Sequence, residues 1–468
     1  MNFTIRQIAE AAGGRLVYQG QDISEEAFLN LQADSVVLDS RQVTRGGVFI
    51  AAAGERVDGH SFVTSVYEKG AVLAVVQREP EETEQWQSYL LVEDTLQALK
   101  DIAEGYRKSL KIPVIGITGS VGKTSTKECI AGVLSEKYNV LKTQGNYNNE
   151  IGVPLTLLRI RPEHEAAVVE MGISHFGEMH RLSKMARPDI AVITNIGECH
   201  LENLKDRDGV LKAKTEIFDF MAKDGTICLN GDDDKLRTVA APEGRTLRFF
   251  GLKNREQSAV YAADIVSKGL WGSEAVLHHA SGESYAAEVP LPGVHMVLNA
   301  AAAACVAELL GLTSAQIQAG LKKVAAIGGR NNLIRTEKYT LIDGCYNANP
   351  VSMKAGIDLL CMADTAKAAI LGDMFELGEN SDSMHAEVGA YAAGKGIGRI
   401  ICVGANSRHM YEAALEQAQG SKVTYFDTLE ELLALLKTET GHVLPEGSTV
   451  LIKASHGMQF SKVVELLK

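Results

Sequence analysis

Short apolar segments alternate with amphipathic segments along most of the chain, which is the pattern of α/β proteins. Residues 114–117 form a continuous apolar run between Pro113 and Gly119, as is typical of a buried parallel strand. The same pattern predicts strands at 166–170, 190–194 and 226–229, and helices at 124–137, 176–185, 208–221 and 294–310. Thr313 can cap a further helix. The middle of the chain is therefore predicted to be a doubly wound α/β domain.

Two further regions flank this middle part. Before it, strands are predicted at 35–38, 48–51 and 71–76, and helices at 1–16, 59–69 and 95–110; after Gly328-Gly329, strands are predicted at 339–342, 368–371, 399–403 and 449–452. The last region has no Gly-x-Gly-x-x-Gly in its first turns, so a dinucleotide site is not supported there. We predict three domains: a small α/β N-terminal domain (1–111), a central P-loop ATPase-type domain (112–328) and a C-terminal Rossmann-like domain (329–468).

Charge and cysteine usage narrow the class of protein. The net charge is -12, which does not suit binding to a nucleic-acid backbone. The seven cysteines are scattered and form no Cys-x-x-Cys pair, so reduced thiols are expected rather than zinc sites or a disulfide framework. The first sixteen residues lack the apolar centre of a signal peptide, and no run approaches the roughly 18 apolar residues of a membrane span. We expect a cytoplasmic protein without membrane insertion.

The strongest single motif follows the predicted strand 114–118 and precedes a helix, as a phosphate-binding loop requires. It reads Thr118-Gly119-Ser120-Val121-Gly122-Lys123-Thr124-Ser125. Glycines let backbone N–H groups turn toward an anion, and the helix N-terminus adds partial positive charge. Lys123 can reach the terminal phosphates of ATP, and the Thr124 hydroxyl can ligate Mg²⁺.

The loop departs from the Gly-x-x-x-x-Gly-Lys-[Ser/Thr] pattern, because Ile117 occupies the position of the first glycine. A glycine-rich turn with an exposed lysine is the alternative interpretation. A guanine-reading Asn-Lys-x-Asp is absent, which argues against a GTP switch. A hydrolase or a kinase remains open on this motif alone.

Three more residues are candidates for a metal site. Glu170 ends a predicted strand and His200 follows the next one, so both are expected at the carboxyl edge of the sheet, where the phosphate loop lies. The alternatives are a surface glutamate at a strand end and a structural histidine. Lys214 lies in a predicted helix, and its spacing alone indicates a solvated face.

Together with other segments, these residues resemble the Mur ligases of bacterial peptidoglycan synthesis, and the resemblance covers essentially the whole chain. The matching segments are Asp39-Ser40-Arg41, Phe49-Ile50-Ala51, Asp58-Gly59-His60, 118–128, 145–149, 151–154 and 170–172. Segments 346–350 and 372–379 resemble the branch that adds D-alanyl-D-alanine. The Asp-Asn-Pro-Arg signature of the branch that adds diaminopimelate or lysine is not found.

The resemblance implies roles for individual residues. Lys123 would hold the ATP phosphates, Thr124 and Glu170 one Mg²⁺, and His200 a second. Lys214 would be carbamoylated, because a carbamate is anionic and offers oxygen ligands where an ammonium would be repelled. Further implied contacts are Asn299, Arg330 and Asp343 to the nucleotide, Ser40 and Arg41 to the uridine diphosphate end, and Asn146, Tyr346, Asn347 and Asn349 to the other substrates. Arg330 would also take part in catalysis.

The implied activity is ATP-dependent ligation of D-alanyl-D-alanine to UDP-N-acetylmuramoyl-tripeptide through an acyl phosphate, which serves cell-wall synthesis, cell shape and cell division. Each domain would hold one reactant, with closure aligning them and excluding water, and the protein is expected to be a monomer. Rivals are a paralogue that adds another amino acid or dipeptide, a non-catalytic nucleotide-binding relative, and a folate-type polyglutamate ligase. Departures from the family pattern at Met296, Cys345 and His456 leave fine dipeptide selectivity open, and the third muropeptide residue stays open between diaminopimelate and lysine.

Overall fold

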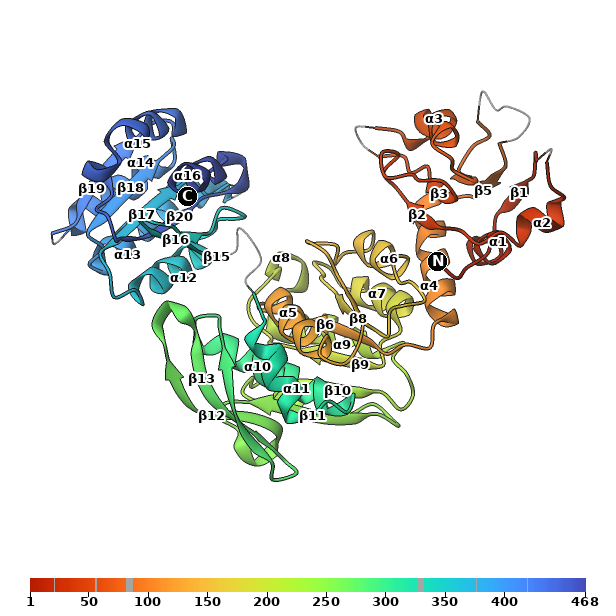
Figure 1. Cartoon of the computed structure of the whole chain (residues 1–468), viewed down its shortest axis with the longest axis horizontal. Coiled ribbons are helices and arrows are strands. Elements are labelled where there is room, and N and C mark those ends of the chain that lie inside the picture. Colours follow the sequence, from red (N-terminus) through yellow and green to blue (C-terminus); the bar gives the residue numbers. More distant parts are fainter. Residues whose placement is uncertain (21, 55–56, 81–86, 326–331, 376, 419) are drawn as a thin grey trace. The chain divides into compact units, whose positions relative to one another are not determined.

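The structure is a computed structural model that describes residues 1–20, 22–54, 57–80, 87–325, 332–375, 377–418 and 420–468 (Figure 1). The described chain forms two compact units. The first comprises Met1–Ala263, Val276–Ala287 and Val297–Lys323, and the second comprises Asp264–Ala275, Glu288–Met296 and Val324–Lys468. The strands form three sheets of five, nine and six strands. The mixed α/β class predicted from the sequence is therefore confirmed.

The five-stranded sheet belongs to the N-terminal part of the first unit. Its strands are β1 (Arg15–Val17), β2 (Ser35–Val37), β3 (Gly47–Ile50), β4 (Leu73–Val76) and β5 (Tyr89–Leu91), in the order β1-β5-β4-β3-β2. Only β1 runs antiparallel to its neighbour. The helices are α1 (Ile5–Ala12), α2 (Glu25–Leu29), α3 (Val63–Glu68) and α4 (Thr95–Ser109). Thr4 and Gln7 cap α1 reciprocally, which fixes the start of the expected amphipathic helix.

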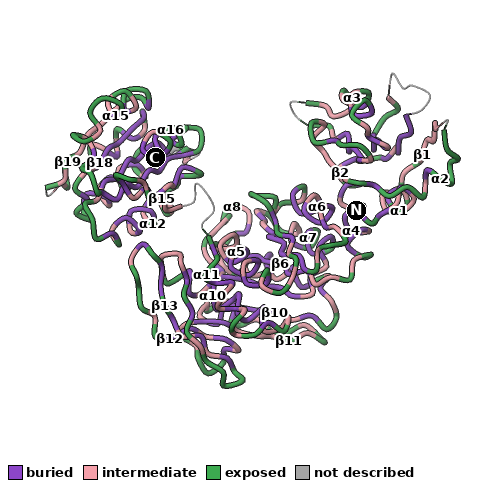
Figure 2. Tube along the Cα trace, viewed as in Figure 1, coloured by how far each residue is buried: buried purple, intermediate pink, exposed green. Residues whose placement is uncertain are grey.

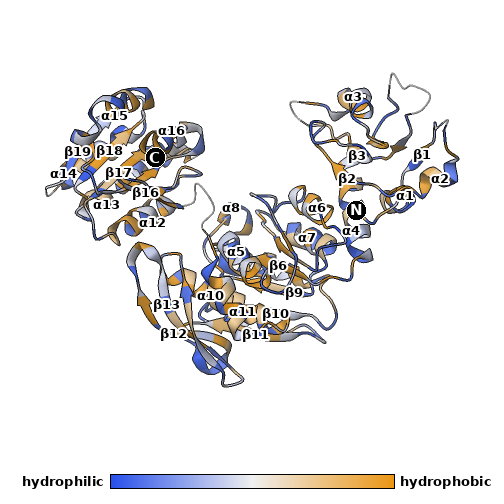
Figure 3. Cartoon of the chain, in the orientation of Figure 1, coloured by the Kyte–Doolittle hydropathy of each residue, from blue (hydrophilic) through white to orange (hydrophobic). Residues whose placement is uncertain are grey.

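The nine-stranded sheet has the order β14-β13-β12-β11-β10-β9-β6-β8-β7. Its bounds are β6 (Val114–Thr118), β7 (Val140–Lys142), β8 (Ala166–Glu170), β9 (Ile190–Ile193), β10 (Thr226–Asn230), β11 (Thr246–Gly251), β12 (Ser258–Ser267), β13 (Ser273–His279) and β14 (Ser284–Val289). All the pairs from β7 to β12 are parallel. Every residue of β6, β8 and β9 is buried, as their continuous apolar runs predict (Figures 2 and 3).

Helices surround the parallel strands of this sheet. They are α5 (Lys123–Leu134), α6 (Gly152–Leu157), α7 (Glu178–Ala186), α8 (Leu201–Leu204), α9 (Arg207–Thr215), α10 (Val294–Leu309) and α11 (Ser314–Lys322). Thr313 caps α11, as predicted. The helix expected at 208–221 is shorter: α9 ends at Thr215 and a 3-10 helix, Glu216–Phe218, follows. The strands β11 to β14 were not predicted.

The six-stranded sheet lies in the second unit, in the order β15-β16-β20-β17-β18-β19. Its strands are β15 (Asn332–Arg335), β16 (Thr340–Asp343), β17 (Lys367–Gly372), β18 (Arg399–Val403), β19 (Lys422–Phe426) and β20 (Thr449–Lys453). The helices are α12 (Pro350–Cys361), α13 (Ser381–Gly394), α14 (Ser407–Gln417), α15 (Leu429–Val443) and α16 (Ser461–Leu467). Only β15 is antiparallel to its neighbour, which gives a parallel α/β sheet with a reversed edge.

No helix among the described residues is both long and apolar enough to cross a membrane. The domain boundaries at residues 111 and 328 remain a prediction, and the second of them falls outside the described residues.

Candidate functional site: a phosphate loop with carboxylate and lysine neighbours

The phosphate loop joins the end of β6 to the start of α5, as the sequence predicts. Gly119 has φ +147° and Gly122 has φ +82°, a region of backbone conformation that favours glycine. A Cβ at Gly119 would lie 1.9 Å from the Thr194 hydroxyl oxygen, so the loop passes very close to the end of β9. Glycine is therefore required at this position both for conformation and for space.

The segment after β9 holds the loop in place through hydrogen bonds. The Thr194 hydroxyl donates to the Val121 carbonyl at 2.6 Å, and the Asn195 side-chain oxygen accepts from the Val121 N–H at 2.9 Å. The Ser120 N–H donates to the Asn195 carbonyl at 3.0 Å. Sequence reasoning missed Thr194 and Asn195 as loop supports, although their position directly after a buried strand was a usable signal.

Glu170, at the end of β8, lies beside the start of α5 and is only 2% exposed. Its Oε1 accepts from the Thr124 hydroxyl at 3.1 Å and from the Asn148 amide at 2.9 Å. Its Oε2 is buried and has no hydrogen-bond partner among the described residues. The structure thus brings together Thr124 and Glu170, and it leaves one carboxylate oxygen without a hydrogen bond. Hard oxygen ligands of this kind suit Mg²⁺.

Lys127 is a buried lysine beside Glu170, and the sequence analysis did not predict this contact. It is 1% exposed, and its Nζ lies 3.8 Å from Glu170 Oε2 and 3.2 Å from Glu128 Oε1. The same amine donates to the Thr143 carbonyl at 2.8 Å, while the Thr143 hydroxyl accepts from the Glu170 N–H. Lys127 and Thr143 therefore help to fix the position of the glutamate, together with Thr124 and Asn148.

Lys214 lies in α9 and is 1% exposed, which contradicts the solvated helix face that its spacing indicates. Burial, with the charge of Lys123 adding to it, lowers the pKa of Lys214 to about 8. The pKa of His200 is also lowered, first by partial burial and then by the charges of Lys214 and Lys123. The three side chains are therefore close enough to interact electrically around the loop.

His200 has φ +52°, and it begins α8 on an exposed loop. Among the described residues, no group of three or more His, Cys, Asp or Glu side chains gathers as a ready-made metal site. Thr124 and Glu170, which are hydrogen-bonded to each other, are the pair of candidate metal ligands that the structure brings into direct contact.

Asn299, in α10, is buried against the start of the loop helix. Its side-chain oxygen accepts from the Thr126 hydroxyl at 3.0 Å and lies 3.8 Å from where a Cβ of Gly122 would be. The Lys123 amine donates to the Gly119 carbonyl at 2.8 Å. The structure thus places Asn299 next to the phosphate loop, and its contact with the nucleotide remains a prediction. Arg330, the Gly328-Gly329 pair and Glu376 lie outside the described residues.

A pocket of about 530 Å³ opens elsewhere in the first unit, between the end of β2 and the segment before α6. Its lining includes Asp39, Asn146, Tyr147, Arg159 and Arg161. Asn146 therefore lies at this pocket, whereas Ser40 and Arg41 follow the lining residue Asp39 directly. The Arg41 guanidinium makes three hydrogen bonds with the Asp39 carboxylate, and these, with a further one from the Arg41 N–H, lower the pKa of Asp39 to about 2.

The candidate residues of the second unit lie after β16. Asp343 ends the strand, and its carboxylate accepts from the Cys345 N–H at 3.1 Å. Tyr346 and Asn347 are exposed, and Asn349 caps α12 by accepting from the Ser352 N–H at 2.8 Å. Asn349 thus has a structural role at the start of α12, which the sequence analysis did not predict.

Lys453, at the end of β20, supports this loop and was not predicted. Its buried amine donates to the carbonyls of Asn347 at 2.9 Å and Gly344 at 3.4 Å. Burial lowers the pKa of Lys453 to about 8, against the opposing effect of Cys345 and Asp343.

The chain matches known proteins over its whole length. It matches three domain profiles, described as Mur ligase family, catalytic domain (32–107), Mur ligase middle domain (117–307) and Mur ligase, glutamate ligase domain (329–456). It is 34% identical over 465 residues to the UDP-N-acetylmuramoyl-tripeptide--D-alanyl-D-alanine ligase of Bacillus subtilis, with 99% of this chain and 97% of that protein covered. The chain belongs to the Mur ligase family.

Solved structures agree with this Mur ligase assignment. A crystal structure of MurF from Acinetobacter baumannii superposes with a TM-score of 0.88 at 32% identity, covering 100% of this chain and 99% of that one. MurF ligase from Thermotoga maritima, crystallised with ADP, superposes with a TM-score of 0.75 at 29% identity over 92% of this chain and 96% of that one. The expected family and ligase class are confirmed.

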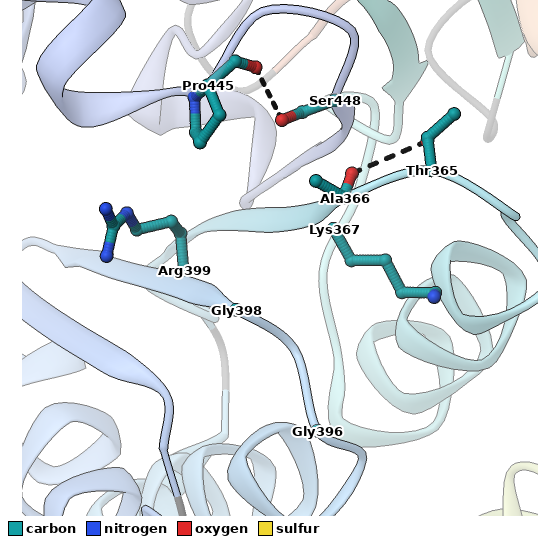
Figure 4. A pocket seen from close by; sticks show the side chains of 8 residues that line it. All are labelled: Thr365, Ala366, Lys367, Gly396, Gly398, Arg399, Pro445 and Ser448. Atoms are coloured by element: carbon teal, nitrogen blue, oxygen red, sulfur yellow. Dashed lines mark hydrogen bonds between the residues drawn. The ribbon is translucent and has the colours of Figure 1, made fainter.

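A second pocket of this Mur ligase, about 400 Å³, lies at the amino ends of β17 and β18 (Figure 4). The candidate residues Asp343 and Tyr346 follow the opposite, carboxyl end of the parallel β16. Figure 4 shows that the charged ends of Lys367 and Arg399 point away from each other, so they do not converge on one anion. The pocket is therefore separate from the candidate site.

Proposed function

We propose that this chain joins D-alanyl-D-alanine to UDP-N-acetylmuramoyl-tripeptide, with ATP as the energy source, and so completes the pentapeptide precursor of peptidoglycan. The observation that carries the proposal is the arrangement of Lys123, Thr124 and Glu170 at the carboxyl ends of β6 and β8. The relatives at 34% identity that bear the name of this activity support the choice of substrates.

The reaction begins with the phosphate loop binding ATP. The Ser120 and Val121 N–H groups are already donated to Asn195, so the N–H groups at the start of α5 are the ones proposed to face the phosphates, and Lys123 neutralises charge on the transferring group. The terminal carboxylate of the tripeptide attacks the γ-phosphorus, so ADP leaves and an acyl phosphate forms. The amine of D-alanyl-D-alanine then attacks the acyl carbon, a peptide bond forms, and phosphate leaves. No protein nucleophile is needed for these steps.

Thr124 and Glu170 are the residues that would hold Mg²⁺, with His200 contributing to a second ion. Bound Mg²⁺ supplies positive charge beside the phosphates. The Oε2 of Glu170 supports this assignment, because it is buried without a hydrogen bond and its one neighbouring cation among the described residues, the Lys127 amine, lies 3.8 Å away.

A carbamate at Lys214 is part of the same proposal. A lysine with a pKa of about 8 has a larger share of neutral amine at physiological pH than an ordinary lysine, and only the neutral amine reacts with CO₂. The resulting carbamate is an anion, so it replaces repulsion from Lys123 by attraction and offers oxygen ligands to Mg²⁺.

The pocket of about 530 Å³ in the first unit is proposed to receive part of the muropeptide. Arg159 and Arg161 give it positive charge that suits a substrate bearing carboxylates and a diphosphate. Ser40, Arg41 and Asn146 are proposed contacts for this substrate, and Tyr346, Asn347 and Asn349 for the dipeptide. Asp343 and Arg330 are proposed nucleotide contacts.

The family resemblance also supports a cytoplasmic, monomeric enzyme acting in cell division, and these points belong to the proposal. Its test is a panel of amines: purified protein receives ATP, Mg²⁺ and a tripeptide ending in diaminopimelate or lysine, and product masses are read. We expect a product with D-alanyl-D-alanine and none with D-glutamate, diaminopimelate or lysine. A product with one of those single amino acids instead would identify a paralogue of different specificity.

A further inference from the structure

Two cysteines of the first unit, one in a strand and one in a helix, are in contact with each other, and neither has a role in the proposed reaction. Cys228 lies in β10 and Cys305 in α10, and both are 0% exposed. Their sulfur atoms are 3.8 Å apart, in contact as a thiol hydrogen bond. A disulfide needs about 2.05 Å between its sulfur atoms, so these two would have to approach each other by about 1.8 Å more to form one.

A half-buried polar network adjoins the pair. The Arg248 guanidinium, from β11, pairs with the Glu308 carboxylate one helical turn after Cys305 in α10. His279 Nδ1 lies 3.5 Å from Glu308 Oε2, and its Nε2 is 2.9 Å from the Tyr285 hydroxyl. The Arg248 Nε is buried and has no hydrogen-bond acceptor among the described residues. A donor of this kind is available to an anion on sulfur.

The two thiols differ in acidity. The hydrogen bond with Cys228 and the charge of Arg248 lower the pKa of Cys305, although burial acts in the opposite direction. The pKa of Cys228 is raised, first by the hydrogen bond with Cys305 and then by burial. Cys305 is therefore the thiol that ionises first, and thiolates are the reactive form of cysteine.

We propose that Cys228 and Cys305 are a site of reversible oxidation, at which a hydroperoxide produces a disulfide linking β10 to α10. Cys305 is the attacking group and Cys228 the resolving one. The proposal does not depend on the ligase reaction.

The chemistry balances in two steps. The Cys305 thiolate attacks one oxygen of hydrogen peroxide: a sulfur–oxygen bond forms, the oxygen–oxygen bond breaks, and hydroxide leaves with the electron pair. The sulfur loses two electrons and the peroxide gains them. The Cys228 sulfur then attacks the sulfenic sulfur, the disulfide forms, and the leaving oxygen departs as water with the thiol proton. The hydroxide of the first step takes up the proton that Cys305 lost on ionising, so two thiols and one hydrogen peroxide give one disulfide and two waters.

The test uses the full-length folded protein and millimolar hydrogen peroxide. After exposure, free thiols are blocked, and the protein is digested without reductant and read by mass spectrometry. We expect a peptide pair linked through Cys228 and Cys305, with a mass lower by two hydrogen atoms than the two free peptides together, and the loss of both these thiols from the seven that are free in the chain. Dithiothreitol should restore all of them. The proposal is overturned if both thiols stay free after the more accessible Cys199 and Cys361 have been oxidised.

Two variants separate the roles of the thiols. In Cys228→Ser the sulfenic acid on Cys305 cannot be resolved, so dimedone should label Cys305 at least about tenfold more than it labels Cys228 in Cys305→Ser. Cys129→Ser is the matched control, since Cys129 is equally buried and burial raises its thiol pKa to about 12. This control should form the Cys228–Cys305 link normally. Equal labelling of the two serine variants would contradict the assigned order.

Discussion

At the scale of single residues, the lysines around the phosphate loop differ in burial and therefore in charge. Lys123 is partly exposed and keeps its amine next to the Gly119 carbonyl at 2.8 Å. Lys214 is buried, and its pKa of about 8 means that about one molecule in ten carries a neutral amine at pH 7. One lysine is thus suited to holding phosphate and the other to becoming an anion by reaction with CO₂.

Removing the Lys123 amine should abolish most of the activity. Lys123→Ala is expected to lower kcat at least about a hundredfold, because a preorganised charge next to the transferring phosphoryl group is lost. Steady-state ADP release measures this effect. Lys437→Ala, which removes an exposed lysine in α15, is the control and should turn over normally. Near-normal turnover of Lys123→Ala would reject the role assigned to the loop.

Removing the Lys214 side chain should give an enzyme that responds to added carboxylic acids. Lys214→Ala is expected to be largely inactive and to recover part of its rate with acetate or propionate, because a small carboxylate can occupy the place of the carbamate. Lys212→Ala, two residues away on the exposed face of α9, should neither lose activity nor respond to the acids. A fully active Lys214→Ala enzyme would end the carbamate hypothesis.

At the scale of elements, the loop between β6 and α5 depends on glycine at one point of close approach. Gly119→Ala is expected to weaken ATP binding at least about tenfold, since its Cβ would lie 1.9 Å from the Thr194 hydroxyl oxygen and displace the loop. Isothermal titration with a non-hydrolysable ATP analogue measures the affinity.

The control for this change is Gly282→Ala in the turn between β13 and β14. Gly282 also has positive φ, at +90°, but a Cβ there would meet no atom within 4 Å. Its substitution should cost about 1 kcal/mol of stability and leave ATP affinity unchanged. Equal ATP affinities of the Gly119 and Gly282 variants would show that the close approach to β9 is unimportant.

Lys453, whose amine connects β20 to the loop after β16, predicts a pH dependence of the free energy of unfolding. Burial lowers the pKa of Lys453 to about 8, so between that value and about 10.4 the unfolded chain holds a proton that the folded chain has lost. Stability therefore rises with pH across this window. Relative to Lys453→Met, the wild type should gain about 2 kcal/mol between about pH 7.5 and about pH 9.5.

Amide hydrogen exchange of β20, followed as urea concentration rises, measures this gain in the free energy of unfolding for the six-stranded sheet. Lys367→Met, at the other end of the adjacent β17, is the control and should follow the pH dependence of the wild type. If Lys453→Met also follows the wild type, the buried amine does not titrate as proposed.

The sequence predicted best the elements whose signal is local. β6 and β8 match their predicted bounds because continuous apolar runs between turn residues specify buried parallel strands. The strands β11 to β14 were missed because polar and apolar residues mix in them, and their sheet position depends on neighbours distant in sequence. Likewise, Lys127 and Lys453 were missed because burial, which no local pattern shows, gives them their contacts.

At the scale of the whole molecule, three sheets provide three sets of candidate contacts. The five-stranded sheet leads into a pocket with Arg159 and Arg161, the nine-stranded sheet carries the phosphate loop, and the six-stranded sheet carries the loop that Lys453 supports. One set is proposed for each reactant: muropeptide, ATP and dipeptide. Separate binding sites for the three reactants suit a reaction that joins two substrates at the expense of a third, ATP.

The most direct test follows an oxygen atom. The protein receives ATP, Mg²⁺, D-alanyl-D-alanine and a UDP-N-acetylmuramoyl-tripeptide whose terminal carboxylate is labelled with oxygen-18. If the carboxylate becomes an acyl phosphate, each new peptide bond is accompanied by one ADP and by one inorganic phosphate that carries a single labelled oxygen. Unlabelled phosphate, or ADP released without a new peptide bond, would contradict the account.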